Sequence, residues 1–341
     1  MLATSTHDTK HGEDARARLA VVSELPDEWL RLTLNCSRIL RGPRSPTETE
    51  SSPDRNDEYL FYQLLLGSWP VDLLRAERLE STTLQAYAER LRQTMRKSLR
   101  EARVHSTWAI PNLAYEEATL AFVDTALLSN RSAVFLATFL PFAGRIAALG
   151  AHNSLLQTVI KLTAPGVPDI YQGAELWDLS MVDPDNRRPV DYAQRRRLLD
   201  EVDTALKLDR RAAMRGFFTS WQDARFKLAA LTTLLQYRRQ SAELFAAGNY
   251  QNLETQGTQA ECVCAFARQH GDQVLLCLTA RFPSRLQSRS FDADSTIALP
   301  ENLQGHPWWD LLSGRELSAH DGSLSAQAVF SDLPAAVLIR H

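Results

Sequence analysis

The chain has 341 residues, of which 44% are hydrophobic, and a formal net charge of −3. This length is enough for two or three ordinary domains, and the hydrophobic share argues against wholesale disorder. The nearly balanced charge argues against nucleic acid as a partner. The sequence does not open with a basic segment followed by an apolar one, so we expect no secretory signal and a cytoplasmic protein.

A disulfide framework and a metal centre are both unexpected. The four cysteines are too few and too scattered for a framework of disulfides. No Cys-x-x-Cys pair occurs in the sequence, and no histidine lies at zinc spacing, so we predict no metal site. The longest apolar stretch, 133–142, contains Pro141 and is far shorter than a membrane span, so no membrane partner is expected.

Helical patterns dominate the first part of the chain. A short strand-like start over residues 2–6 is followed by predicted helices over 12–24, 28–40, 58–66, 82–104 and 112–128. Pro26 is expected to break the helical pattern, and Asn112 is a typical N-cap. The polar, proline-containing stretch 42–57 predicts an exposed loop.

The spacing of hydrophobic residues changes in the later part of the chain. Apolar density over 131–162 predicts buried helices, and a short buried strand is predicted over 167–171. Helices over 192–205 and 226–240 come next. After Gly248 the pattern predicts an antiparallel β region, with strands over 261–268, 273–279, 295–299, 306–310 and 335–339.

An acidic, arginine-bearing loop follows the strand predicted over 167–171. Near Trp177 it carries Glu175, Asp183, Asp185, Arg187, Arg188 and Asp191. Carboxylates and guanidinium groups can bridge sugar hydroxyls, and an indole can stack on a pyranose, so the pattern is consistent with a sugar site. A salt-bridged surface loop is the alternative. The acids superficially match a calcium loop but lack its glycine and distal glutamate, so we predict a turn held by Asn and Asp side chains.

Several segments together resemble the maltooligosyl trehalose synthase family of the α-amylase superfamily. Residues 164–177 with 182–191 are similar to its final barrel strand and following loop, and Thr4–Lys10 is similar to its His-Asp signature. Further matches lie at 56–63, 67–70, 104–108, 111–112, 115–116 and 153–157, and the similarity as a whole extends from the first residues to about residue 250 and more loosely beyond. His11-Gly12 departs from the Arg-Ser-like pair expected there.

The resemblance implies an α/β plus all-β fold. We expect the C-terminal part of a TIM (β/α)8 barrel, namely strands 7 and 8 with their helices, an all-helical insertion and a C-terminal antiparallel β-sandwich. The expected parts are a partial barrel over 1–24, a helical lid over 25–125, a second partial barrel over 126–247 and a β domain over 248–341.

The resemblance also assigns roles to residues. Asp8 is the expected catalytic residue, the third carboxylate of the family, and His7 and Lys10 are expected to contact the same sugar. Further substrate contacts are expected from Tyr171, Glu175, Trp177, Asp185, Arg187 and Arg188. Asp57, Glu58 and Trp108 are interpreted as structural. No cofactor is required for the chemistry.

The implied activity is an intramolecular transglucosylation in trehalose biosynthesis. The reducing-end α-1,4 bond of a maltooligosaccharide becomes an α,α-1,1 bond. The nucleophile and acid/base of this retaining mechanism lie in the family on earlier barrel strands, so we expect this chain to be inactive alone. Its expected partners are the maltooligosaccharide and the N-terminal part of the same enzyme. A non-catalytic α-glucan-binding fragment and half of a split enzyme are the alternatives.

Overall fold

The described residues of the computed structural model, 1–41, 52–75, 81–286 and 290–340, fall into two units. The helical unit comprises residues 7–150 and 179–188, and the sheet unit comprises residues 1–6, 151–178 and 189–341. Each unit is therefore built from separate stretches of chain. Most of the loop predicted over 42–57 lies outside the described residues.

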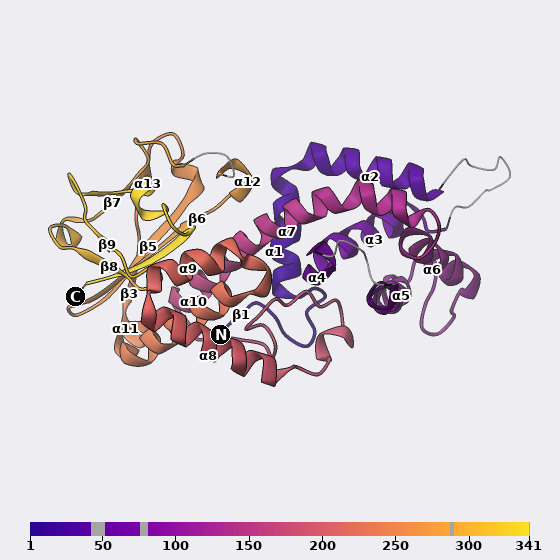
Figure 1. Ribbon diagram of the computed structural model, residues 1–341, viewed down its shortest axis with the longest axis horizontal. Coiled ribbons are helices and arrows are strands. Elements are labelled where there is room, and N and C mark those ends of the chain that lie inside the picture. The colour runs from indigo at the N-terminus through magenta and orange to yellow at the C-terminus, as the bar shows by residue number, and fades with distance from the viewer. Residues whose placement is uncertain (42–51, 76–80, 287–289, 341) are drawn as a thin grey trace. The chain divides into compact units, whose positions relative to one another are not determined.

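The helical unit is built from helices (Figure 1). Its core is rich in aromatic side chains. Its helices are α1 (Glu13–Val21), α2 (Pro26–Arg41), α3 (Arg55–Ser68), α4 (Val71–Arg75), α5 (Ser81–Ala102), α6 (Leu113–Leu127) and the first part of α7 (Ser132–Thr163). Phe61, Trp69 and Phe135 are completely buried in this core. Helices α5 and α6 pack against each other.

Local chemistry sets two helix boundaries in this unit. The side chain of Asn112 accepts a hydrogen bond from the backbone N–H of Tyr115 at 3.2 Å, which confirms the predicted N-cap of α6. The predicted break of the helical pattern at Pro26 is confirmed, because the first helical segment ends at Glu24 and Pro26 is the first residue of α2. A first-turn residue has no intrahelical acceptor for its N–H, so proline is tolerated there.

The apolar segment after residue 131 forms one helix of 32 residues, α7, rather than several. By length and composition alone α7 could cross a membrane, so the expectation that no segment is long enough was wrong about length. Its buried side chains, however, belong to the two cores, with Phe139 in that of the helical unit and Val159 in that of the sheet unit. Core packing therefore accounts for those apolar side chains of α7 that are buried.

The sheet unit combines helices with two antiparallel sheets (Figure 1). Its longer helices are α8 (Tyr192–Leu208), α9 (Arg210–Thr219), α10 (Arg225–Gln240) and α11 (Ala242–Ala247), and its short ones are α12 (Pro283–Leu286) and α13 (Ala326–Val329). The six-stranded sheet has the order β3 (Asn249–Asn252), β5 (Val263–His270), β6 (Gln273–Ala280), β11 (Ala335–Ile339), β8 (Trp308–Asp310), β9 (Glu316–Leu317). The smaller sheet has the order β10 (Ser323–Ser325), β7 (Thr296–Ala298), β4 (Thr255–Gln256).

The central strands of the larger sheet are buried on both faces. In β6, Leu275 and Cys277 pack with the helices, whereas Leu276 and Leu278 pack with residues of the smaller sheet. Side chains alternate between the faces of a strand, so burial of both faces explains the nearly continuous apolar sequence of β6. These sheets confirm the prediction of antiparallel β structure near the C-terminus.

A third sheet consists of two very short parallel strands. β1 (Leu2–Ala3) pairs with β2 (Pro168–Asp169), with Leu2 opposite Pro168. The prediction of a buried strand over 167–171 was wrong in length and burial, because Val167 is 66% exposed and both β2 residues are half-buried. β1 is the one neighbour of β2 in the described sheet, so the other edge of β2 is not covered by a strand.

Candidate functional site

The His7-Asp8 turn follows β1 and lies in the helical unit. His7 Nε2 and Asp8 Oδ2 are 3.2 Å apart, and their side chains are 60% and 81% exposed. The side-chain amide of Asn186 donates a hydrogen bond to the backbone carbonyl of His7 at 2.8 Å. The turn is therefore fixed through its backbone by the 179–188 segment, while both side chains stay accessible to a ligand.

Lys10 connects the same turn to helix α5. Its Nζ lies 3.0 Å from Glu101 Oε2, and Lys97 Nζ lies 3.7 Å from Glu101 Oε1. Lys97 also donates a hydrogen bond to the backbone carbonyl of Asp183 at 2.8 Å. A chain of charged side chains thus joins the His7-Asp8 turn, α5 and the loop around Asp183 within one unit.

Asp185 is the buried centre of that loop. Arg90 donates two hydrogen bonds to its carboxylate, at 2.7 and 2.8 Å, and the backbone N–H of Met181 donates a third at 2.8 Å. Burial alone would raise the pKa of Asp185, but the hydrogen bonds and positive charge of Arg90 hold that pKa below its ordinary value. The carboxylate that was predicted to bind sugar therefore positions the loop in this structure.

The two loop arginines pair with acids of the same loop. Arg187 Nε lies 2.6 Å from Asp183 Oδ1, and Arg188 Nε lies 3.0 Å from Asp185 Oδ1. Arg188 also donates to the backbone carbonyl of Asp185. The hydrogen bond from the Met181 N–H to the Asp185 side chain agrees with a turn held by its own acid. Both arginine side chains remain about half exposed.

The other predicted sugar contacts, Tyr171, Glu175 and Trp177, lie in the sheet unit. Glu175 Oε2 accepts a hydrogen bond from Arg195 Nε at 3.0 Å, and Arg195 also donates to the backbone carbonyl of Gly173. Glu175 and Arg195 thereby join the loop after β2 to helix α8. Tyr171 is half-buried at the beginning of this loop.

Packing within the sheet unit accounts for the position of Trp177. Its indole N–H donates to the backbone carbonyls of Trp221 and Gln222, at 3.1 and 3.0 Å. Its ring packs against the rings of Trp221 and Phe226, and Lys227 Nζ lies 5.8 Å from the ring centroid. Trp177 is a partly buried member of the core around α10.

Reasoning from sequence did not identify the residues of α5 that face the 179–188 segment. Arg90, Lys97 and Glu101 all contact this segment or the His7-Asp8 turn through the interactions described above. Their spacing of seven and then four residues places them on one face of a helix. A row of charged residues beside the apolar face of α5 is a sequence signal that could have indicated this interaction surface.

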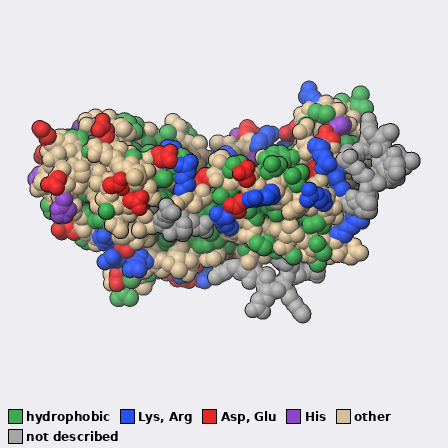
Figure 2. Space-filling model, turned by 90° about the horizontal axis from the view of Figure 1, so that it is seen from above, with side chains coloured by type: hydrophobic (Ala, Val, Ile, Leu, Met, Phe, Trp, Pro, Cys, Tyr) green, Lys and Arg blue, Asp and Glu red, His purple; other side chains and the backbone are tan. Residues whose placement is uncertain are grey.

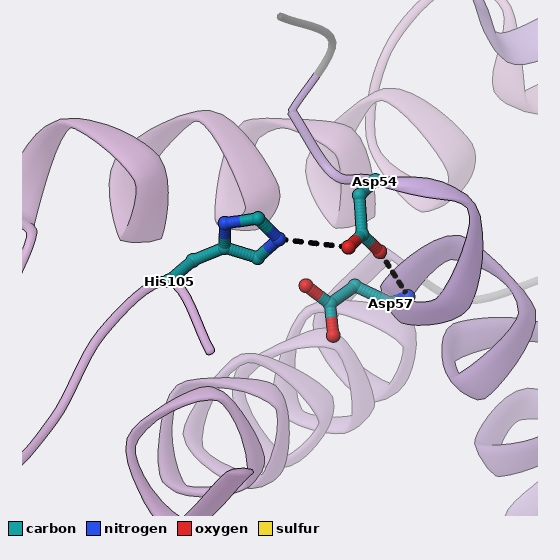
Figure 3. Close-up of side chains that lie close together, drawn as sticks. All are labelled: Asp54, Asp57 and His105. Carbon is teal, nitrogen blue, oxygen red and sulfur yellow. Dashed lines mark hydrogen bonds and ion pairs between the residues drawn. The ribbon is translucent and has the colours of Figure 1, made fainter. Parts of the chain in front are cut away.

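A separate cluster of titratable side chains lies at the beginning of α3. Possible ligand atoms of Asp54, Asp57 and His105 lie within 4.8 Å of one another (Figure 3). Asp54 caps α3 by accepting the Asp57 N–H at 2.8 Å, and it lies 2.7 Å from His105 Nε2. The hydroxyl of Tyr115 donates to Asp57 and accepts the N–H of Asp54.

These hydrogen bonds give the cluster a structural role. Burial opposes the charge of Asp54, but the Asp57 N–H and His105 hold the pKa of its carboxyl below the ordinary value. Burial raises the pKa of Asp57, and the hydrogen bond from Tyr115 only partly offsets this effect. The partial positive charge at a helix N-terminus also disfavours a cation there. We therefore interpret the cluster as a polar contact between α3 and the segment before α6.

Comparison with known proteins relates the whole chain to one family. Two proteins from strains of Mycobacterium tuberculosis, each named "Putative maltooligosyl trehalose synthase", are 35% identical over 343 aligned residues, which cover 100% of this chain. The structure of maltooligosyltrehalose synthase from Arthrobacter ramosus matches 99% of the chain with a TM-score of 0.76 and 29% identity. The chain is homologous to the C-terminal portion of maltooligosyl trehalose synthase. No family model matches it.

The match covers nearly all of this chain but only part of each relative. The chain spans 37% of the length of the mycobacterial proteins and 38% of the Arthrobacter protein. A Sulfolobus tokodaii structure named as a hypothetical maltooligosyl trehalose synthase matches 99% of this chain with a TM-score of 0.69, and 38% of that protein is covered. The resemblance of this chain to the family is therefore confirmed at the level of the whole chain.

Proposed function

We propose that this chain provides the C-terminal part of an enzyme that converts the reducing-end α-1,4 bond of a maltooligosaccharide into an α,α-1,1 bond. The observation that carries this proposal is the match of the whole chain to maltooligosyl trehalose synthases at 35% identity, with a TM-score of 0.76 to one of their structures. Because the chain spans little more than a third of those proteins, the remainder of the active site comes from residues outside this sequence.

In this proposal β1 and β2 are the last two strands of a TIM barrel. Their parallel pairing supports the assignment, since neighbouring barrel strands are parallel and joined through helices. The His7-Asp8 turn follows the C-terminal end of β1, where the active-site residues of such barrels lie. The two antiparallel sheets correspond to the C-terminal β-sandwich, and the helices between residues 25 and 125 to a lid that closes over substrate.

Asp8 is the catalytic residue that this chain contributes. Its carboxylate accepts hydrogen bonds from two hydroxyls of the distorted glucose, and these bonds strengthen as positive charge develops at the anomeric carbon. His7 binds a hydroxyl of the same sugar. Both side chains are exposed and close together, as this role requires. The nucleophile and acid/base belong to the N-terminal part, and a closed pocket excludes the water that would cause hydrolysis.

The test compares the chain alone with a mixture of the chain and a separately produced N-terminal part. With maltopentaose, the mixture is expected to consume reducing ends and release a non-reducing product, whereas the chain alone leaves reducing ends unchanged. Asp8→Asn in the mixture is expected to lower kcat at least about a thousandfold, because it removes a charge used in the transition state. Turnover by the chain alone, or full activity of the Asp8→Asn mixture, would contradict the proposal.

A further inference from the structure

A cleft of about 260 Å³ lies in the helical unit, between α5 and residues 182–185. Arg90, Arg96, Lys97 and Arg100 line it from α5, and Trp108 lines it from the loop before α6. Ligand pockets for drug-sized molecules range from about 300 to 1,000 Å³. The cleft is thus suited to one small group rather than to a whole oligosaccharide.

Trp108 is held at the cleft by contact with Arg100. Its side chain is 58% exposed, although large aromatic side chains are usually more buried. The guanidinium carbon of Arg100 lies 5.0 Å from the centroid of the indole, and Arg100 is itself fixed by two hydrogen bonds to Glu116 at 2.8 and 2.7 Å. The indole therefore provides a preorganised, solvent-accessible ring at the cleft.

The charges around the cleft are largely compensated. Arg90 binds Asp185 and Arg100 binds Glu116, each through two hydrogen bonds, and Lys97 donates to the carbonyl of Asp183. Arg96 differs, because its Nε is 3.9 Å from Glu116, beyond hydrogen-bond distance, and its side chain is 46% exposed. Compensated charges favour a neutral ligand with hydroxyls over a phosphate, which would need positive charge without acidic partners.

The cleft is connected to the proposed substrate-binding turn. Glu101, one residue after Arg100, pairs with Lys10 at 3.0 Å and lies 3.7 Å from Lys97 Nζ in the cleft wall. Asn186, next to the cleft residue Asp185, binds the backbone carbonyl of His7. The same helix and the same loop thus border both the cleft and the His7-Asp8 turn.

We propose that this cleft is a subsite for one glucosyl unit of an α-glucan. The indole of Trp108 stacks on the apolar face of the pyranose, and Arg96 with the carboxylate of Asp183 binds its hydroxyls. This inference rests on the proposed function for the identity of the ligand. It assigns a binding role to Trp108, which the sequence had suggested to be structural, and to Arg96, which the sequence had not singled out.

The first experiment observes Trp108 directly in the chain as it stands. The indole N–H resonance of Trp108 is identified as the one lost in Trp108→Phe, and maltopentaose or inorganic phosphate is then titrated. A saturable shift of this resonance with maltopentaose, and none with phosphate, is expected. A shift with phosphate alone, or movement of other indole resonances while that of Trp108 stays constant, would overturn the subsite.

The second experiment uses the mixture with the N-terminal part. Trp108→Ala and Arg96→Ala are expected to raise KM for maltopentaose about fivefold to tenfold with kcat nearly unchanged, as loss of uniform binding predicts. Trp108→Phe should largely restore the low KM, and Arg38→Ala, at an exposed arginine on α2, is the matched control. Unchanged KM in both alanine variants would overturn the subsite while leaving the proposed function intact. If no mixture turns over, the proposed function fails, and the titration of Trp108 alone decides the subsite.

Discussion

The side chain of Asn186 is hydrogen-bonded to the backbone carbonyl of His7, 179 positions earlier in the sequence, at 2.8 Å. This bond fixes the segment that presents Asp8 without involving either side chain of the His-Asp pair. Asn186 is thus a positioning residue for the proposed catalytic carboxylate.

Replacing Asn186 by alanine is expected to affect catalysis more than folding. One lost hydrogen bond lowers the free energy of unfolding by about 1 kcal/mol, whereas a displaced catalytic group can reduce kcat by about a hundredfold. Denaturant unfolding and turnover by the mixture with the N-terminal part measure the two effects. Asn35→Ala, which removes a surface interaction with Arg38, is the control, and equal kcat in both variants would contradict the positioning role.

The two acids of the 179–188 loop are expected to differ in their contribution to stability. Asp185→Asn removes the charge opposite Arg90 in a buried pair, so it should lower the free energy of unfolding by about 3 kcal/mol. Asp183→Asn removes partly exposed pairs with Lys97 and Arg187 and should cost less than about 1 kcal/mol. Urea unfolding of the two variants tests this order, and a larger effect at Asp183 would show that Asp185 does not position the loop.

Substitution by alanine is expected to have opposite effects on stability at two glycines of α7, Gly144 and Gly150. A Cβ at Gly150 would lie 2.5 Å from Cγ and 2.8 Å from Cα of the buried Arg18, so Gly150→Ala should destabilise the protein by about 1–3 kcal/mol. At Gly144 a Cβ meets nothing within 4 Å, and Gly144→Ala should stabilise α7 by about 0.5–1 kcal/mol. Thermal unfolding of both variants measures the difference, and a stabilised Gly150→Ala variant would exclude the close approach of Arg18.

Stability is expected to decrease between pH 7 and pH 5 because of His152. Burial lowers the pKa of His152 from its ordinary value of 6.5 to about 4, although the hydrogen bond to the carbonyl of Ala280 at 2.6 Å acts in the opposite direction. Between these values the unfolded chain binds more protons than the folded one, so stability falls as the pH is lowered. The contribution of this residue is on the order of 2 kcal/mol.

His152→Gln tests this pH dependence, because glutamine can donate a hydrogen bond but does not titrate. The free energy of unfolding of this variant should change less between pH 7 and pH 5 than that of the unchanged protein. Urea unfolding at the two pH values provides the measurement. An equal loss in both proteins would show that other groups cause the acid sensitivity.

Features that depend on neighbouring residues could be predicted from the sequence. The strand Ala335–Ile339, the Asn112 cap and the amphipathic α5 all follow from local periodicity or from a hydrogen bond within one helical turn. The pairing of Arg187 and Arg188 with acids a few residues earlier is local in the same sense. The family resemblance was also available, since it is carried by short contiguous segments.

Features that depend on distant residues were decided by the tertiary structure. The sequence indicated acids in the 179–188 loop, but only the fold shows that Asp185 is bound by Arg90, 95 positions earlier. Likewise, the position of Trp177 in an acidic, arginine-bearing loop suggested that it stacks on a sugar. Only the fold shows that it contacts Trp221 and Phe226, as a core residue does. Local sequence patterns specify which backbone groups form hydrogen bonds within a helix or a strand. The residues that a side chain contacts depend instead on the path of the whole chain, because that path brings residues far apart in the sequence into contact.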